Sequence, residues 1–259
     1  MSLFDIVLLS IAGFVAGSVN AVAGGGTFFS FPALLAVGVP PVIANASNSV
    51  ALWPASLSSA WAYRNELRSQ GRLLIVLCVL SLVGGVGGGL LLLAVKENTF
   101  TTLIPWLLLF ATLLFAFSKR FSTLLAGVGK TPRDSTTACS AAVGIGYFIV
   151  AIYGGFFGAG MGILMLAALS IDGYEDVHEI NAIKNLLSAV VYSVAVLTFV
   201  VAGAVAWSHA WIVLVAATAG GYAGAQAARR IPARWLRGGI IGVGLGLSLV
   251  YFFKVYGPA

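Results

Sequence analysis

The stretch "NAVAGGGTFFSFPALLAVGVPP", residues 20–41, places an asparagine and three consecutive glycines inside an apolar N-terminal region. A glycine in a helix interior costs about 1 kcal/mol relative to alanine, and an unpaired amide in an apolar environment is also unfavourable. We therefore expect the helix that begins near residue 3 to break at Gly24–Gly26. The apolar piece that follows, 27–39, is shorter than the roughly 20 residues that a membrane-spanning helix needs.

The composition around this stretch is that of a polytopic membrane protein. The chain has 259 residues, of which 60% are hydrophobic and 8% are charged, whereas soluble proteins carry about 25% charged residues. The expected environment is therefore the lipid bilayer. In such a protein the formal charge of +6 belongs in cytoplasmic loops. No basic patch with interleaved aromatic residues accompanies this charge, so nucleic acid is not an expected partner.

Hydrophobic patterning predicts an all-α fold with eight long spans and two short broken or re-entrant helices. The short apolar pieces, 27–39 and 163–171, each follow a glycine cluster directly. The long apolar segments, each near the roughly 20 residues that cross the hydrocarbon, are 3–23, 43–63, 73–95, 100–118, 138–157, 181–203, 209–228 and 238–256.

The distribution of lysine and arginine predicts the orientation. Three basic loops are expected in the cytoplasm, namely 64–72, 119–137 and 229–237. The loops 96–99 and 204–208 and both chain termini then lie outside. With this orientation the region 138–171 must cross the membrane twice, or enter it and return.

The two glycine clusters belong to an internal repeat. The segment 24–50 resembles the segment 158–187, and each contains a glycine cluster, a short apolar helix, a polar loop and an asparagine near the start of a long helix. Equivalent loops fall on opposite faces, which predicts two inverted-topology repeats of about five passes each. The expected units are a first repeat 1–118, a cytoplasmic linker 119–136 and a second repeat 137–259. The alternative is that glycine-rich membrane helices align by chance.

The glycine clusters are candidates for an anion site. Broken backbone at membrane depth is tolerated only inside protein or beside a wet cavity, and a helix that restarts there directs N–H groups and its positive dipole end at the gap. The alternative role is close helix packing through small residues. The candidate residues are Gly24, Gly25, Gly26 and Thr27 at the first cluster and Gly158, Gly160 and Gly162 at the second.

Polar side chains in the flanking apolar segments add to this prediction. Asn20, Asn48 and Asn185 can donate hydrogen bonds to an oxyanion, although asparagines also join membrane helices to one another. Asn45 and Ser47 lie where helix N-caps are expected.

Lys184 is the most informative single residue. It is expected about one turn into a long apolar helix, and ionisable residues in such helices mark pathways or pairs. Lys184 would attract an anion or carry a proton. The alternatives are that its ammonium reaches the interface or pairs with Glu179. Ser47 occupies the matching place in the first repeat, so the charge is confined to the second.

Enzymatic and metal-binding motifs are not apparent. The chain has two histidines, His178 and His209, too few for a three-histidine metal set, and no nucleophile elbow or phosphate-binding glycine motif occurs in a soluble domain. We expect no catalytic residue, metal or cofactor.

Two long motifs resemble those of the sulfite exporter TauE/SafE family. The first is "GFVAGSVNAVAGGGTFFSFPALLAVGVPPVIANASNSVALWPASLSSAWAYR" (13–64). The second is "GGFFGAGMGILMLAALSI" (154–171) followed by "EINAIKNLLSAVVYSVAVLTFVVAG" (179–203). The resemblance implies a permease of the bacterial or archaeal inner membrane that moves sulfite or small organosulfonates outward.

The resemblance covers some of the candidate residues. Asn20 and Gly24–Gly26 match the first motif, and Gly158, Gly160, Met161 and Gly162 match the second. Lys184 and Asn185 match a Lys-Asn pair that often follows Ala-Thr in the family, but Ile183 replaces that threonine here. Asn45 and Ser47 likewise lie where the family usually has a Thr-Asn pair.

These observations predict an anion exporter that works by alternating access, driven by the membrane potential or a proton gradient. Its partners would be a small anion and the bilayer, and a homodimer is compatible with the sequence. An anion channel and a membrane scaffold or partner subunit remain as alternatives.

Overall fold

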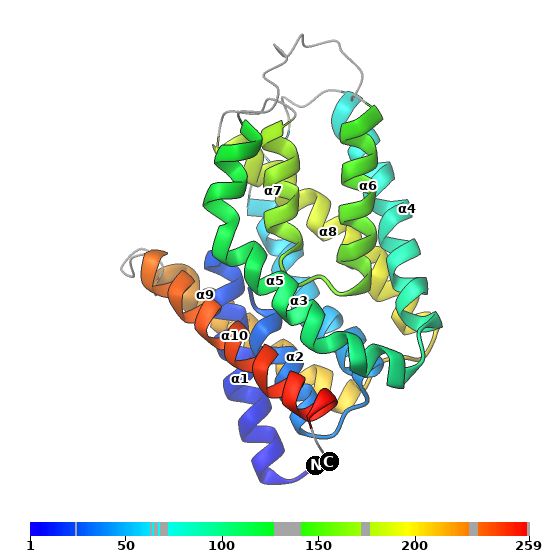
Figure 1. Ribbon diagram of the computed structural model, residues 1–259, viewed down its shortest axis with the longest axis vertical. Helices are drawn as coiled ribbons and strands as arrows, with labels where there is room; N and C mark the ends of the chain where they lie inside the picture. The colour runs from blue at the N-terminus through cyan, green and yellow to red at the C-terminus, as the bar shows by residue number, and fades with distance from the viewer. Residues whose placement is uncertain are drawn as a thin grey trace.

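A computed structural model describes residues 1–23, 25–62, 64, 67, 72–126, 141–171, 177–227 and 233–257. In this part of the chain the structure is all-helical and has ten helices (Figure 1). They are α1 (Leu3–Ala23), α2 (Thr27–Ala36), α3 (Pro41–Ala62), α4 (Arg72–Ala94), α5 (Glu97–Ala126), α6 (Ala141–Phe156), α7 (Met161–Ile171), α8 (Val177–Val201), α9 (Trp207–Ala227) and α10 (Ala233–Tyr256).

Each predicted apolar segment corresponds to one helix, but several boundaries differ. Helix α3 begins at Pro41, because proline at the first helical position loses no hydrogen bond and has a helical φ. Asn45 and Ser47 are therefore inside α3, and the prediction that they are N-caps was wrong. Helix α8 begins at Val177, which places Lys184 about two turns into the helix rather than one. Helix α5 continues to Ala126 and so includes the start of the predicted linker.

Five of the helices in the described residues are long and apolar enough to cross a membrane, fewer than the eight expected. Helix α3 does not reach this hydropathy because it carries Asn45, Ser47, Asn48 and Ser49, all buried in the protein. A helix enclosed by others needs fewer apolar residues than one that faces lipid. The five candidate spans are Leu3–Asn20, Leu73–Ala94, Glu97–Phe117, Ala182–Val201 and Gly238–Tyr256.

The long helices pack in close pairs. Helix α1 packs along α9, and α4 packs along α6. A Cβ atom added to Gly88 of α4 would overlap the carbonyl oxygen of Ile152 in α6, and one added to Gly17 of α1 would overlap that of Ala217 in α9. Small residues bring membrane helices into backbone contact in this way. Helix α3 packs against α8 and α9, and α5 packs against α10.

Helix α2 is enclosed by the long helices, whereas α7 buries the face that carries Met161, Met165 and Leu169. Phe28, Phe31 and Leu34 of α2 are completely buried. The ring of Phe31 meets those of Phe157 and Phe100 edge to face, with centroids 5.6 and 6.4 Å apart. Such pairs add roughly 0.5–1.5 kcal/mol each beyond their area burial. This cluster covers the backbone where α6 gives way to α7.

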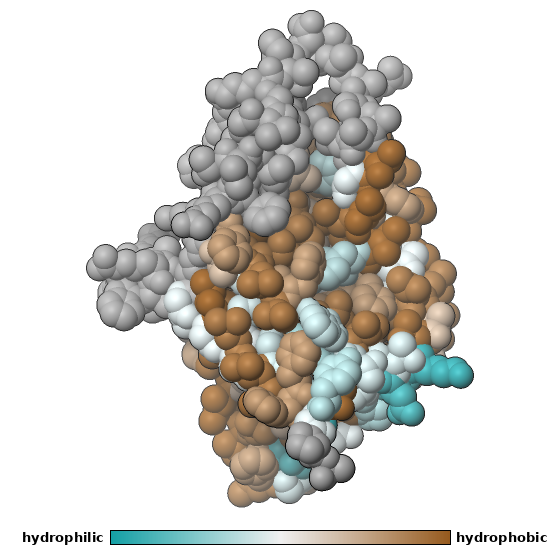
Figure 2. Space-filling model, in the orientation of Figure 1, coloured by the Kyte–Doolittle hydropathy of each residue, from teal (hydrophilic) through white to brown (hydrophobic). Residues whose placement is uncertain are grey.

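The outer surface is apolar, as expected for a protein in lipid. Figure 2 shows hydrophobic residues over most of the visible described face, with hydrophilic residues confined to limited areas. Phe4 and Phe253 are exposed by 71% and 74%, which would be unfavourable in water. The start of α1 and the end of α10 lie at the same end of the molecule (Figure 1). Most of the three basic loops used to predict the orientation lies outside the described residues.

Adjacent glycines in α4 provide a test of the helix pairing. Gly88→Ala should lower the thermal unfolding temperature, because the new methyl group meets α6 backbone and overpacking costs about 1–3 kcal/mol. Gly87→Ala is the matched control: its Cβ has open space, and alanine favours the helix by roughly 0.5–1 kcal/mol. Thermal unfolding of both variants in detergent would measure the difference. Equal unfolding temperatures would contradict the close contact.

Candidate functional site

Two chain breaks interrupt the helices, and they differ in their need for glycine. Between α6 and α7, Gly158 and Gly160 each have φ = +77°, a conformation that residues with a Cβ rarely adopt. At the first break Gly26 has ordinary helical angles, but an added Cβ would lie 2.6 Å from the carbonyl oxygen of Ala16. The second break therefore requires glycine for its conformation, and the first requires it for space. Gly24 lies outside the described residues.

The restarted helices leave fewer N–H groups free than the glycine clusters predict. At α2 the N–H groups of Phe28, Phe29 and Ser30 donate to the carbonyls of Gly25 and Gly26. At α7, Met161 donates to Gly158, and both Ile163 and Leu164 donate to Gly160. Among the described residues, the Gly162 N–H has no such acceptor. Side chains must therefore supply most donors at any site near these breaks.

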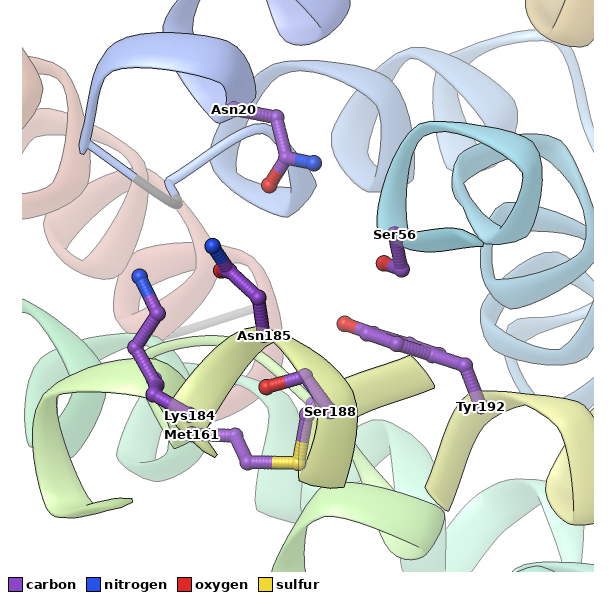
Figure 3. Close-up of a pocket in the computed structure, with 9 residues that line it drawn as sticks. Asn20, Ser56, Met161, Lys184, Asn185, Ser188 and Tyr192 are labelled. Carbon is purple, nitrogen blue, oxygen red and sulfur yellow. The ribbon is translucent and has the colours of Figure 1, made fainter. Parts of the chain in front are cut away.

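A polar cavity of about 60 Å³ lies beside the second break (Figure 3). One ordered water needs roughly 10–15 Å³ on this measure, so the cavity has room for several waters or one compact anion. Four helices and the α6–α7 connection supply its walls. The lining residues are Asn20 of α1, Ser56 of α3, Gly158, Met161 and Gly162 at the break and α7, and Lys184, Asn185, Ser188 and Tyr192 of α8.

Helix α8 contributes most of the polar groups because they share one face. Lys184, Ser188 and Tyr192 are spaced four residues apart, and side chains at this spacing lie above one another on a helix. In Figure 3 the amides of Asn20 and Asn185 approach the cavity from opposite sides, and the hydroxyls of Ser56 and Tyr192 point into it. The cavity thus has hydroxyl and amide donors on several sides.

Lys184 is the one charged residue among the described residues that line the cavity. Its side chain is half-buried, and Gly162 leaves room for it: a Cβ added there would lie 3.6 Å from the Lys184 Cδ. None of the described residues that line the cavity is a carboxylate. The described lining therefore contains a basic group and no acidic group, which suits an anion.

Five of the predicted site residues line this cavity: Asn20, Gly158, Gly162, Lys184 and Asn185. The described remainder lie behind or away from its walls, namely Gly25, Gly26, Thr27, Ser47, Asn48 and Gly160. Three of these, Ser47, Asn48 and Thr27, make side-chain hydrogen bonds. The Ser47 hydroxyl accepts a hydrogen bond from the Ala206 N–H at 2.9 Å. The Asn48 amide accepts from Ser30 and donates to Thr27, the latter over 3.3 Å.

The aligned positions of the two halves therefore have different surroundings. Asn48 is 1% exposed and hydrogen-bonds to Ser30 and Thr27, whereas the aligned Asn185 faces the cavity. Ser47 holds the start of α9, whereas the aligned Lys184 supplies the charge. The candidate site is built mainly from the second half of the chain.

Sequence analysis did not identify Ser56 or Ser188 as site residues. Ser188 follows Lys184 by four residues, so helical spacing from the lysine would have indicated it. Ser56 follows Asn48 by two turns on α3, but serines are common in membrane helices and nothing local distinguishes this one.

Comparison with known proteins identifies a family for this chain. The sequence model described as "Sulfite exporter TauE/SafE" matches residues 9–251. The chain is 25% identical to a "Probable membrane transporter protein" of Haemophilus influenzae over 237 residues, 85% of this chain and 84% of the relative. It is 27% identical to the "Probable membrane transporter protein YfcA" of Escherichia coli K12, over 89% of this chain and 83% of the relative. No solved structure gives a significant match.

The contact of Ser47 with the α8–α9 turn predicts a stability effect. Ser47→Ala leaves the Ala206 N–H without its acceptor, which should cost about 1–3 kcal/mol and lower the thermal unfolding temperature. Ser58→Ala is the control, because the Ser58 hydroxyl is exposed and donates within its own helix, to the carbonyl of Ala55. Similar unfolding temperatures for both variants would show that the Ser47 contact contributes little.

Proposed function

Because the chain belongs to the sulfite exporter TauE/SafE family, we propose that this membrane transporter exports sulfite or a small organosulfonate across a bacterial or archaeal inner membrane. The observation that carries the proposal is the cavity with one cationic side chain and no carboxylate among its described lining residues. Lys184 supplies the charge that attracts the anion, and neutral donors surround the anion's oxygens.

The chemistry of the lining matches an oxyanion with several acceptor oxygens. A lysine ammonium has three donors, and the amides of Asn20 and Asn185 and the hydroxyls of Ser56, Ser188 and Tyr192 add more. At about 4 Å and an effective dielectric constant near 20, opposite unit charges attract by about 4 kcal/mol. Lys184 at this depth would therefore contribute a large share of the binding energy.

The pairing of the helices supports the proposed inverted repeat. Suppose that α1–α5 correspond to α6–α10 in order. The packing of α1 against α9 should then be repeated by the packing of α6 against α4, and both contacts are present. The contact of α3 with α9 likewise becomes that of α8 with α4, and α5 pairs with its own equivalent, α10. The cavity draws on α1 and α3 of one half and α7 and α8 of the other, which is where inverted-repeat transporters bind substrate.

The proposed transport cycle is alternating access with the anion moving outward. Export of a monovalent anion from a cell with a negative interior is favoured by about 2.3 kcal/mol per 100 mV. The membrane potential can therefore drive export without a coupled ion. A proton gradient is the second source, and Lys184 is the residue that would carry the proton.

Counterflow in proteoliposomes tests the function. Labelled sulfite should exchange faster when unlabelled sulfite is present on the opposite side, as in a carrier. A channel would conduct without this stimulation, and a scaffold would show no flux. Sulfoacetate in place of sulfite extends the test to organosulfonates.

Neutralising the cavity charge tests its role. Lys184→Met keeps much of the side-chain length and should reduce sulfite exchange at least about tenfold, since it removes a charged donor worth roughly 1.5–3 kcal/mol. Lys254→Met is the control, because Lys254 is exposed near the end of α10 beside the Tyr251 ring. Undiminished exchange by Lys184→Met would exclude the lysine from binding.

The proposed orientation, with both termini outside, predicts the labelling of single cysteines. In a background without Cys78 and Cys139, a cysteine at Ser2 or Ala202 should react with a membrane-impermeant maleimide in intact cells. A cysteine at Gln70, in the first basic loop, should react only after lysis. The reverse pattern would show that the proposed orientation is wrong.

A further inference from the structure

The connection between α6 and α7 forms part of the cavity wall, but its own residues fix its shape only weakly. Gly158 lines the cavity, and both Gly158 and Gly160 have φ = +77°. Glycine has the widest choice of backbone conformations and loses the most entropy when it is held in one of them. Contacts from other residues must therefore hold this connection in its observed conformation.

Two side chains hold the connection through its carbonyl oxygens. The Tyr153 hydroxyl donates a hydrogen bond of 2.6 Å to the carbonyl of Ala159, which lies between the two glycines. The Asn45 Nδ2, on α3, donates a hydrogen bond of 2.8 Å to the carbonyl of Phe156, the last residue of α6. A carbonyl oxygen can only accept, so the direction of both hydrogen bonds is fixed. Among the described residues, neither carbonyl accepts a backbone N–H of the connection.

Tyr153 is itself held in place at both ends of its side chain. Its backbone carbonyl accepts from the N–H groups of Phe157 and Gly158, over 2.9 and 3.2 Å. Its ring meets that of Phe110 in α5 edge to face, with centroids 5.6 Å apart. The hydroxyl is thus presented to Ala159 from a fixed ring, and one residue holds both the start and the middle of the connection.

The surroundings of Asn45 show which part of its amide the protein uses. Asn45 is completely buried, and within the described part of the chain its Oδ1 has no hydrogen-bond partner. A buried acceptor without a partner is unfavourable, so packing alone would favour an apolar side chain at this position. The hydrogen bond from the Asn45 Nδ2 to the Phe156 carbonyl is the contact that explains an asparagine here.

We propose that Tyr153 and Asn45 are positioning residues, which preform the anion site by fixing the α6–α7 connection. Neither lines the cavity, so neither would touch a bound anion. The place of the connection matters because the Gly158 backbone lies against a cavity residue: a Cβ added to Gly158 would be 2.7 Å from the Tyr192 Oη. Without its anchors the connection would adopt other conformations, and only the fraction in the present one would bind. The inference rests on the proposed function and deepens it.

Sulfite counterflow at varied concentration tests the Tyr153 anchor. Tyr153→Phe keeps the ring and removes the hydroxyl, and should raise the half-saturating sulfite concentration about fivefold, the value of one buried hydrogen bond. Apparent affinity falls with the fraction in the binding conformation, whereas saturating sulfite restores that conformation and leaves the maximal rate unchanged. Ser47→Ala is the control, because it leaves a backbone group unpaired away from the cavity, the Ala206 N–H. Its half-saturating concentration should equal that of the wild type.

Asn45→Leu tests the second anchor with little change in stability. It leaves the Phe156 carbonyl unpaired but also removes the unpaired Asn45 Oδ1, so the number of buried unpaired acceptors stays the same. The thermal unfolding temperature should therefore remain close to that of the wild type, while the half-saturating sulfite concentration rises about fivefold. For either variant, a lower maximal rate at an unchanged half-saturating concentration would indicate a role in stability alone and overturn the proposal.

Hydrogen–deuterium exchange without ligand separates this inference from the proposed function. In Tyr153→Phe, the N–H groups of residues 157–164 should exchange about fivefold faster than in the wild type, because the connection opens more often. Ser47→Ala should leave this segment unchanged. Equal exchange in Tyr153→Phe and the wild type would overturn the anchoring. Absence of both sulfite and sulfoacetate counterflow in the wild type would instead overturn the proposed function, whatever the amide exchange shows.

Discussion

The structure depends on one constraint: backbone N–H and C=O groups exposed to lipid cost several kcal/mol each. A helix can therefore break at membrane depth only inside protein. Both breaks meet this condition, since Gly25 and Gly26 at the first and Gly158 and Gly160 at the second are buried. The phenylalanine cluster of α2 and α5 that encloses the second break is thus a requirement for the polar cavity beside it.

Around the cavity, the polar residues that stabilise the fold differ from the residue that carries the charge. Neutral hydrogen bonds hold polar residues of α3 in place, as with Asn48 and Ser47. Lys184 is then the one charge at the cavity wall among the described residues. Because the described lining holds no carboxylate, this ammonium retains its electrostatic attraction for a diffusible anion.

Sequence analysis predicted the all-helical class, the ten helical segments and the family, because hydropathy and glycine clusters are local properties of the chain. It predicted Lys184 and Asn185 as site residues because polar groups in apolar segments are conspicuous. It did not separate Asn48 from Asn185, since the aligned residues look alike and only the three-dimensional packing shows that Asn48 faces Thr27 and Ser30. Ser56 was missed for the same reason, because its position depends on how α3 crosses α8.

The glycine contacts of the long helices have a mechanical consequence. Where Gly17 and Gly88 bring backbone against backbone, there are no interdigitating side chains whose rotamers could change and let one helix slide along the other. We therefore expect α1 and α9 to move as one rigid unit, and α4 and α6 as another. The cavity lies beside the glycine-containing connection that follows α6, so a rotation of the α4–α6 pair would change the shape of the cavity.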